Sequence, residues 1–226
     1  MTSPANCPGP NLPRRRVRRK LAIIVRVVAL VAAMTSESGM IRAASASAPA
    51  PAPAPGGAYR LSSWPHHTAR PDFSLIDFDS RPRTLADYHG KIVVLMFGFV
   101  RCPDVCPTEL YKIARAIKKL GPGSDRVQVL FITLDPERDT PAVLKNYIAA
   151  FDPRFAGLSG TTAQTDAAAA SFFVQYAKVP EGDDYIISHS TGIYLIDAGG
   201  QLRLVGTMNT TVADLAHDIA SLAAEK

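Results

Sequence analysis

Cysteine is scarce in this chain, with three residues among 226. Cys7 lies ahead of a basic run near the N-terminus, so only Cys102 and Cys106 fall in the body of the chain. A structural zinc site takes four ligands, typically from two such pairs, and one pair does not supply them. A disulfide here would close a very short loop and constrain the unfolded chain little, so a purely structural bridge is disfavoured.

A long uninterrupted apolar run is also missing. Residues 21–34 are apolar but contain Arg26, and a membrane-spanning helix needs about 20 apolar residues. Residues 14–20 are basic, and small residues at 44–48 fit a signal-peptidase site. We therefore predict that residues 1–48 are a signal peptide or an N-terminal membrane anchor. We expect the protein to be exported to the bacterial periplasm. The alternatives are that residues 1–48 anchor it to the inner membrane or that they are a mitochondrial presequence.

The body of the chain has no excess of positive charge. The formal net charge is +5, but eight of the 25 Lys and Arg residues and only one of the 20 acidic residues lie in residues 1–48. The remaining residues keep 17 basic and 19 acidic side chains, a net of −2. The body also shows no basic face with interleaved aromatic residues, so nucleic acid is not an expected partner.

Composition suggests a single folded domain. Residues 49–71 form an Ala/Pro-rich linker and lead-in, of the kind that stays extended and joins no core. No internal repeat and no second linker interrupts residues 72–226, which we predict to be one domain.

Hydrophobic patterns alternate between strands and helices along this domain. Buried strands are expected at residues 92–100 and 127–134, where apolar runs rich in β-branched and aromatic residues end at turn signals. The order predicts an α/β, thioredoxin-like fold with a mixed central sheet flanked by helices. The other expected elements are a strand at 73–78, helices at 107–120, 140–151, 165–177 and 212–224, and a hairpin of strands 192–196 and 202–205.

The cysteine pair lies where a buried strand meets a helix. Side chains four residues apart stack on one helical face, so both sulfurs would point to one place. The helix N-terminus would favour the thiolate form. Soft thiolates select Cu(I) or Zn(II) over hard cations. With zinc disfavoured, the pair suits a cuprous ion held by two sulfurs, alone or with one imidazole.

An imidazole ligand would have to come from elsewhere in the chain. His189 precedes the expected strand at 192–196, whose start faces the cysteine-bearing helix in a thioredoxin-like sheet. Spacing alone leaves open whether it is a ligand. The other histidines have less favourable positions, in the lead-in, in a turn or in the last helix: His66, His67, His89 and His217.

Three motifs in order resemble those of the Sco/SenC family. They are Phe-Gly-Phe at 97–99 followed by residues 101–107, the segment 134–141, and residues 184–190 with 194–197. The resemblance covers roughly residues 72–222. Members of this family are thioredoxin-fold copper-binding proteins that help assemble the binuclear copper centre of cytochrome c oxidase.

The resemblance implies a ligand set and a partner. Cys102, Cys106 and His189 would be the ligands of a copper ion, Cu(I) or Cu(II). The partners would be the copper-bearing subunit of cytochrome c oxidase and other copper carriers. Asp135 is a candidate for a docking or outer-sphere role. Arg101 stands where many relatives carry histidine. A solvent-exposed side chain is the favoured interpretation, and the alternative is a cation that favours thiolates or a negatively charged partner.

Two functions from different classes remain open. One is a copper metallochaperone, which is not an enzyme. The other is a thiol–disulfide reductase that prepares the oxidase cysteines, in which Cys102 and Cys106 are the redox pair. A redox sensor would use the same residues, whereas a peroxidase would need a peroxide-activating Thr and Arg around one lone cysteine. The chain lacks the Cys-x-x-Cys spacing of thioredoxins.

Overall fold

The computed structural model describes residues 58–65 and 70–225, which belong to one compact unit. The leader, Cys7, most of the linker, and His66 and His67 lie outside the described residues. None of the described helices combines the length and apolar character that crossing a bilayer requires.

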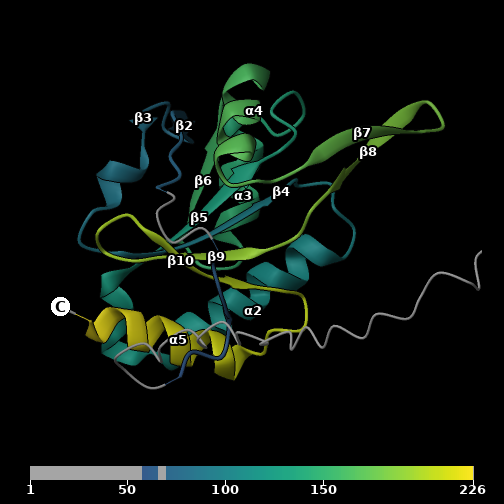
Figure 1. Ribbon diagram of the computed structural model, residues 1–226. Helices are drawn as coiled ribbons and strands as arrows, with labels where there is room; N and C mark the ends of the chain where they lie inside the picture. Colours follow the sequence, from purple (N-terminus) through teal and green to yellow (C-terminus); the bar gives the residue numbers. More distant parts are fainter. Residues whose placement is uncertain (1–57, 66–69, 226) are drawn as a thin grey trace, which may run out of the picture. The chain divides into compact units, whose positions relative to one another are not determined.

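A mixed sheet forms the centre of the described unit (Figure 1). The parallel strands β4 (Ile92–Gly98), β5 (Val127–Thr133) and β6 (Ala156–Ser159) lie side by side. Every residue of β4 is buried, as the sequence predicted for a central strand. Antiparallel strands extend the sheet on both sides: β9 (Ile193–Ile196), β10 (Leu202–Gly206) and β1 (Ser62–Ser63) beyond β4, and β2 (Leu75–Asp77) and β3 (Pro82–Arg83) beyond β6.

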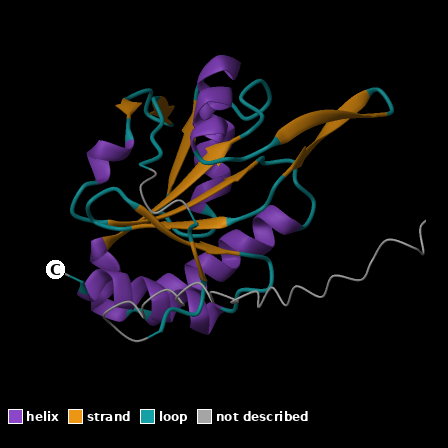
Figure 2. Ribbon diagram, in the orientation of Figure 1, coloured by secondary structure: helices purple, strands orange, loops and turns teal. Residues whose placement is uncertain are grey.

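Helices cover both faces of this sheet (Figure 2). Helix α2 (Val105–Lys119) packs beside α5 (Val212–Ala224), and α3 (Pro141–Ala149) lies on the same face, where Tyr147 contacts Phe131 of β5. The opposite face of β4 carries Phe97, which packs against Phe172 at the end of α4 (Thr162–Ser171). Short 3-10 helices span Leu85–Tyr88 and Gly121–Arg126. The expected α/β, thioredoxin-like fold with a mixed sheet is confirmed.

Helix starts follow the expected capping chemistry, but the third helix was misplaced. The Thr140 hydroxyl accepts the Val143 N–H at 3.4 Å, with Pro141 as the first helical residue. Helix α4 begins at Thr162 rather than 165, because Thr161 and Gln164 form a reciprocal capping box. It ends at Ser171, and Phe173 then adopts a left-handed φ of 59° that no helix can continue.

Residues after α4 form a hairpin that the sequence reasoning did not predict. Strand β7 (Tyr176–Glu181) pairs antiparallel with β8 (Asp184–His189) as a separate two-stranded sheet. The hairpin projects away from the central sheet in Figure 1. His189 is the last residue of β8 and pairs with Tyr176, so the position of this imidazole depends on how the hairpin is held.

The folded part of the chain begins before Asp72, where the sequence placed it. Ser62 and Ser63 pair with β10 as an edge strand. The buried carboxylate of Asp218 in α5 accepts the backbone N–H groups of Arg60 and Leu61, at 3.0 and 2.7 Å. This segment joins the domain through backbone hydrogen bonds, which any amino acid other than proline can form. Its sequence therefore gives little indication that it is part of the fold.

Candidate metal centre

Cys102 and Cys106 lie together at the start of α2, and both are free thiols. The backbone N–H of Cys106 donates to Sγ of Cys102, with an N···S distance of 3.3 Å. Cys102 itself is outside the helix, which begins at Val105. The expectation that the sulfurs stack on one helical face is therefore wrong. The sulfur of Cys102 instead accepts an N–H of the first helical turn, one of the backbone donors that have no partner within the helix.

The two thiols have different environments. Cys102 is partly exposed, whereas Cys106 is fully buried. Burial raises the pKa of the Cys106 thiol well above its ordinary value, although a hydrogen bond with the Phe99 backbone acts in the opposite direction. Cys106 is therefore a protonated thiol at neutral pH in this state, and a metal ion that binds it must displace the proton.

His189 is held close to the same helix start by two contacts. Its Nδ1 lies 2.9 Å from the Ser190 carbonyl oxygen, and its ring meets the edge of Phe99 at a centroid distance of 6.1 Å. The carbonyl selects the tautomer with hydrogen on Nδ1, which leaves Nε2 as the acceptor. Burial lowers the pKa of His189, so the imidazole is neutral and able to bind a metal at neutral pH.

A narrow cavity connects His189 with Cys106. It has about 10 Å³ of free volume, no more than one water molecule needs. Among the described residues, no three His, Cys, Asp or Glu side chains lie close enough together to hold a metal ion as they stand. The donors fit a soft ion in kind, but a three-ligand site requires the His189 side chain and the cysteines to approach each other. The residues that line the cavity are Met96, Phe97, Val105, Cys106, Glu109, His189, Thr191, Gly192, Ile193, Thr207 and Met208.

Asp135 and Arg101 belong to a polar cluster that fixes the β7–β8 hairpin, here called the hairpin clamp: Asp135, Arg138, Asp184, Tyr185 and Arg101. The buried Asp135 carboxylate pairs with the Arg138 guanidinium and accepts the Tyr185 hydroxyl at 2.7 Å. Arg138 also donates to Asp184 and to the Tyr185 carbonyl, each at 2.9 Å, and its guanidinium lies 3.7 Å from the centroid of the Tyr185 ring. Arg101 pairs with Asp184 at 2.8 Å.

The hairpin clamp changes how Asp135 and Arg101 are interpreted. Both side chains contact the hairpin rather than the sulfurs. Arg101 lies just before Cys102 and pairs with Asp184, the first residue of β8, the strand that ends in His189. The cluster therefore ties the cysteine loop, the end of β5 and the histidine strand together.

Asp139 is a further structural residue of the site. Its buried carboxylate accepts the backbone N–H of Val100 at 3.0 Å and the Thr133 hydroxyl at 2.6 Å. Burial raises the pKa of this carboxyl. It joins the turn that precedes Cys102 to the end of β5, while Thr140 alone caps α3. In the sequence, only the position of Asp139 within the motif segment 134–141 could have suggested that it supports the cysteine turn.

Gly98 is required by the packing of Cys106. A Cβ at Gly98 would lie 2.8 Å from Sγ of Cys106 and 2.8 Å from the Phe131 ring. We expect Gly98→Ala to lower the free energy of unfolding by about 1–3 kcal/mol, the usual cost of overpacking, and to increase the reactivity of Cys106 toward a thiol reagent. Gly123→Ala is the matched control, since no atom lies within 4 Å of its Cβ position. Equal stability of the two variants, measured by urea unfolding, would contradict this packing.

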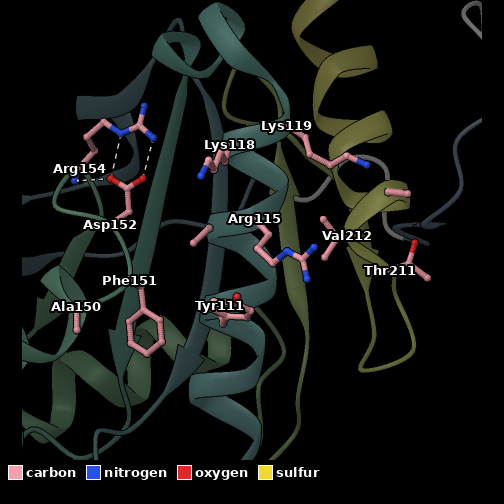
Figure 3. A pocket seen from close by; sticks show the side chains of 12 residues that line it. Tyr111, Arg115, Lys118, Lys119, Ala150, Phe151, Asp152, Arg154, Thr211 and Val212 are labelled. Carbon is pink, nitrogen blue, oxygen red and sulfur yellow. Dashed lines mark hydrogen bonds and ion pairs between the residues drawn. The ribbon is translucent and has the colours of Figure 1, made fainter.

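A broad hollow on the described surface lies away from the thiols (Figure 3). It has a volume of about 960 Å³ and runs along α2, between the end of α3 and the start of α5. Arg115, Lys118 and Lys119 line it, with Tyr111 and Phe151. It contains no thiol or imidazole and does not suit a soft metal. His89 and His217 are also engaged elsewhere, His89 beside Gly200 and His217 with Asp218.

Comparison with known proteins identifies the family. The model of the SCO1/SenC family matches residues 63–224, which is most of the chain. The chain belongs to the SCO1/SenC family. The mouse protein SCO2 homolog, mitochondrial, is 44% identical over 133 residues, which are 57% of this chain and 52% of the mouse protein. This chain thus spans about half the length of the mammalian SCO2 relatives that it matches.

Solved SCO1/SenC structures agree with the fold. The structure of Bradyrhizobium japonicum ScoI with copper bound is 39% identical, with a TM-score of 0.62, over 66% of this chain and 96% of that one. Yeast Sco1 with copper bound is 35% identical, with a TM-score of 0.61, over 66% and 84% of the two chains. The family resemblance read from the sequence motifs is confirmed.

Proposed function

We propose that this protein is a copper metallochaperone that holds the ion through Cys102, Cys106 and His189. The observation that carries the proposal is that the buried thiol of Cys106 and the imidazole of His189 line one cavity, with the sulfur of Cys102 directly hydrogen-bonded to the Cys106 backbone. Two thiols and a neutral imidazole are donors that a cuprous ion prefers. The copper-bound structures of two relatives support the same ion.

Each residue has a part in holding and releasing copper. Cys106 supplies a sulfur that is shielded from water and loses its proton when the ion binds. Cys102, which is partly exposed, is the sulfur that an incoming ligand can reach first. His189 needs no deprotonation, because burial keeps it neutral. An open three-coordinate ion allows an acceptor ligand to attach before the old ligands leave.

The family resemblance supplies the acceptor. We assign delivery to the copper-bearing subunit of cytochrome c oxidase, at its binuclear copper site, with other copper carriers as donors of the ion. The basic and apolar leader favours export to the periplasm, where residues 1–48 would be cleaved or serve as a membrane tether.

Copper transfer can be tested with purified proteins. The reduced protein is loaded with one equivalent of Cu(I), mixed with the copper-free soluble domain of the oxidase subunit, and separated from it, and the copper in each fraction is measured. We expect copper to move to the oxidase domain, Cys102→Ser to bind too little copper to deliver it, and His189→Ala to bind it more weakly, through the two sulfurs alone. Failure of the reduced protein to bind Cu(I) would show that the site is misassigned. So would binding of Cu(I) by both variants as tightly as by the unchanged protein.

Thiol–disulfide reduction is the second candidate, and the unequal burial of the cysteines favours it. An accessible sulfur that accepts an N–H, followed by a buried thiol, is suited to attack a partner disulfide and then resolve the mixed disulfide. Mixing the reduced, copper-free protein with the oxidised oxidase domain separates the two roles. Rapid appearance of free thiols on that domain would support reduction, whereas inert cysteines would remove this candidate.

A further inference from the structure

Methionine is rare in the described chain, and both of its methionines border one cavity. Met96 and Met208 are the only methionines in residues 58–65 and 70–225. They line the same narrow cavity as Cys106 and His189, although Met96 comes from β4 and Met208 from the loop between β10 and α5. The cavity next to the buried thiol is therefore lined by two methionines from different elements.

The two methionines differ in their access to solvent. Met96 is 3% exposed and belongs to the core, whereas Met208 is 57% exposed. A large apolar side chain with this exposure gains little from burial, so packing does not explain its position. Met208 lies where the cavity meets the surface, and Met96 lies inside it.

The loop that carries Met208 is held in place by its backbone. Lys112 of α2 donates to the Met208 carbonyl at 2.9 Å and pairs with the buried Glu109 at 2.7 Å. The Thr210 N–H donates to the Thr207 carbonyl at 2.9 Å, and the Thr210 hydroxyl accepts the Thr207 N–H at 2.9 Å. These contacts fix the backbone of Met208 against the same helix that carries Cys106, while its side chain stays free at the surface.

We propose that Met208 is a transient ligand for Cu(I) as the ion enters and leaves the site. Thioether sulfur is a soft, uncharged donor that selects Cu(I). This inference rests on the proposed copper function and adds a residue that the ligand set Cys102, Cys106 and His189 does not contain. Because Met208 borders the cavity at the surface, it offers the ion a partner while one of the three stable ligands is released.

The exchange involves no change of oxidation state. Copper remains Cu(I), a bond to Sδ of Met208 forms, and the bond to Nε2 of His189 breaks. Both of these donors are neutral, so no proton moves in this step. The thiolates then pass the ion to the acceptor and take up protons from water. Met208 acts on the rate of transfer, whereas Cys102, Cys106 and His189 set the affinity.

The test compares Met208→Leu with the unchanged protein. Leucine keeps the apolar bulk and removes the sulfur, and a surface site tolerates the change. Both proteins are loaded with Cu(I), mixed with a small chromogenic Cu(I) chelator, and followed by stopped-flow absorbance. We expect an unchanged equilibrium affinity and a transfer rate lowered about tenfold, which corresponds to about 1.4 kcal/mol in the barrier. Val143→Ala is the control, because this apolar side chain of α3 is 42% exposed and does not line the cavity, and it should transfer copper at the normal rate.

The outcomes separate this inference from the copper function itself. If the unchanged protein binds no Cu(I), the copper function fails. If it binds Cu(I) and Met208→Leu transfers it at the normal rate, only the role of Met208 is overturned. Normal transfer to the chelator with slower transfer to the oxidase domain would assign Met208 to recognition of that domain rather than to copper binding and would equally overturn the proposal.

Discussion

Arg138→Ala is expected to lower the free energy of unfolding by about 3–5 kcal/mol, the usual cost of removing one partner from a buried ion pair. The Asp135 carboxylate that Arg138 neutralises is fully buried, and Arg138 itself is only 14% exposed. The substitution also removes the hydrogen bonds that fasten Asp184 and the Tyr185 backbone to the domain. Urea unfolding, followed by circular dichroism, measures the loss.

The same substitution is expected to weaken Cu(I) binding. His189 ends the strand that the hairpin clamp holds, so a loosened hairpin would place the imidazole less often beside the sulfurs. Arg101→Ala is the matched control. The side chains of Arg101 and Asp184 are 60% and 55% exposed. Ion pairs this exposed contribute about 0–1 kcal/mol to stability. Equal unfolding free energies for the two arginine variants would contradict the clamp.

Cys106→Ser is expected to lower the Cu(I) affinity by more than about a hundredfold. Loss of a residue that hydrogen-bonds to a metal ligand lowers the metal affinity about 10–100-fold. Here the soft ligand itself is replaced by a hydroxyl, which a cuprous ion binds poorly. The burial of Cys106 means that no water or neighbouring cysteine can take its place. Competition with a chromogenic chelator of known affinity, under reducing conditions, gives the change.

Cys7→Ser provides the control for this measurement. It removes the one cysteine outside the pair Cys102 and Cys106. This cysteine lies in residues 1–48, and its loss should leave the Cu(I) affinity unchanged. A Cys106→Ser protein that binds Cu(I) as tightly as the unchanged protein would remove Cys106 from the ligand set.

Patterns within single elements were predicted well from the sequence. The central strands β4 and β5 lie within the expected ranges 92–100 and 127–134, and α2 and α5 coincide closely with the helices expected at 107–120 and 212–224. These features depend on local chemistry, which the sequence displays directly. The motifs around residues 101–107 and 184–190 also identified the family correctly.

Features that depend on long-range contacts were not predicted. Residues 176–189 form a hairpin with largely exposed side chains, so its sequence has little apolar alternation to reveal it. The strand at Ser62–Ser63 is held through its backbone and by the distant Asp218. The contact of the cysteines was expected for the wrong reason, since Cys102 precedes the helix and accepts an N–H from it.

The roles of the charged residues near the site could not be deduced from spacing. Asp135 and Arg101 were expected to act on the metal, the thiolates or a partner. The structure connects them through Arg138 and Asp184, residues that lie 46 positions apart. Such a network becomes visible only once the fold brings its members together.

X-ray absorption at the copper edge tests the central claim most directly, because it identifies the atoms bound to the ion. For the reduced protein loaded with one equivalent of Cu(I), we predict two sulfur ligands and one imidazole nitrogen, and in His189→Ala the nitrogen should disappear while both sulfurs remain. A spectrum with fewer than two sulfur ligands, or one in which His189→Ala retains the imidazole signal, would contradict the assignment of Cys102, Cys106 and His189 as the copper site.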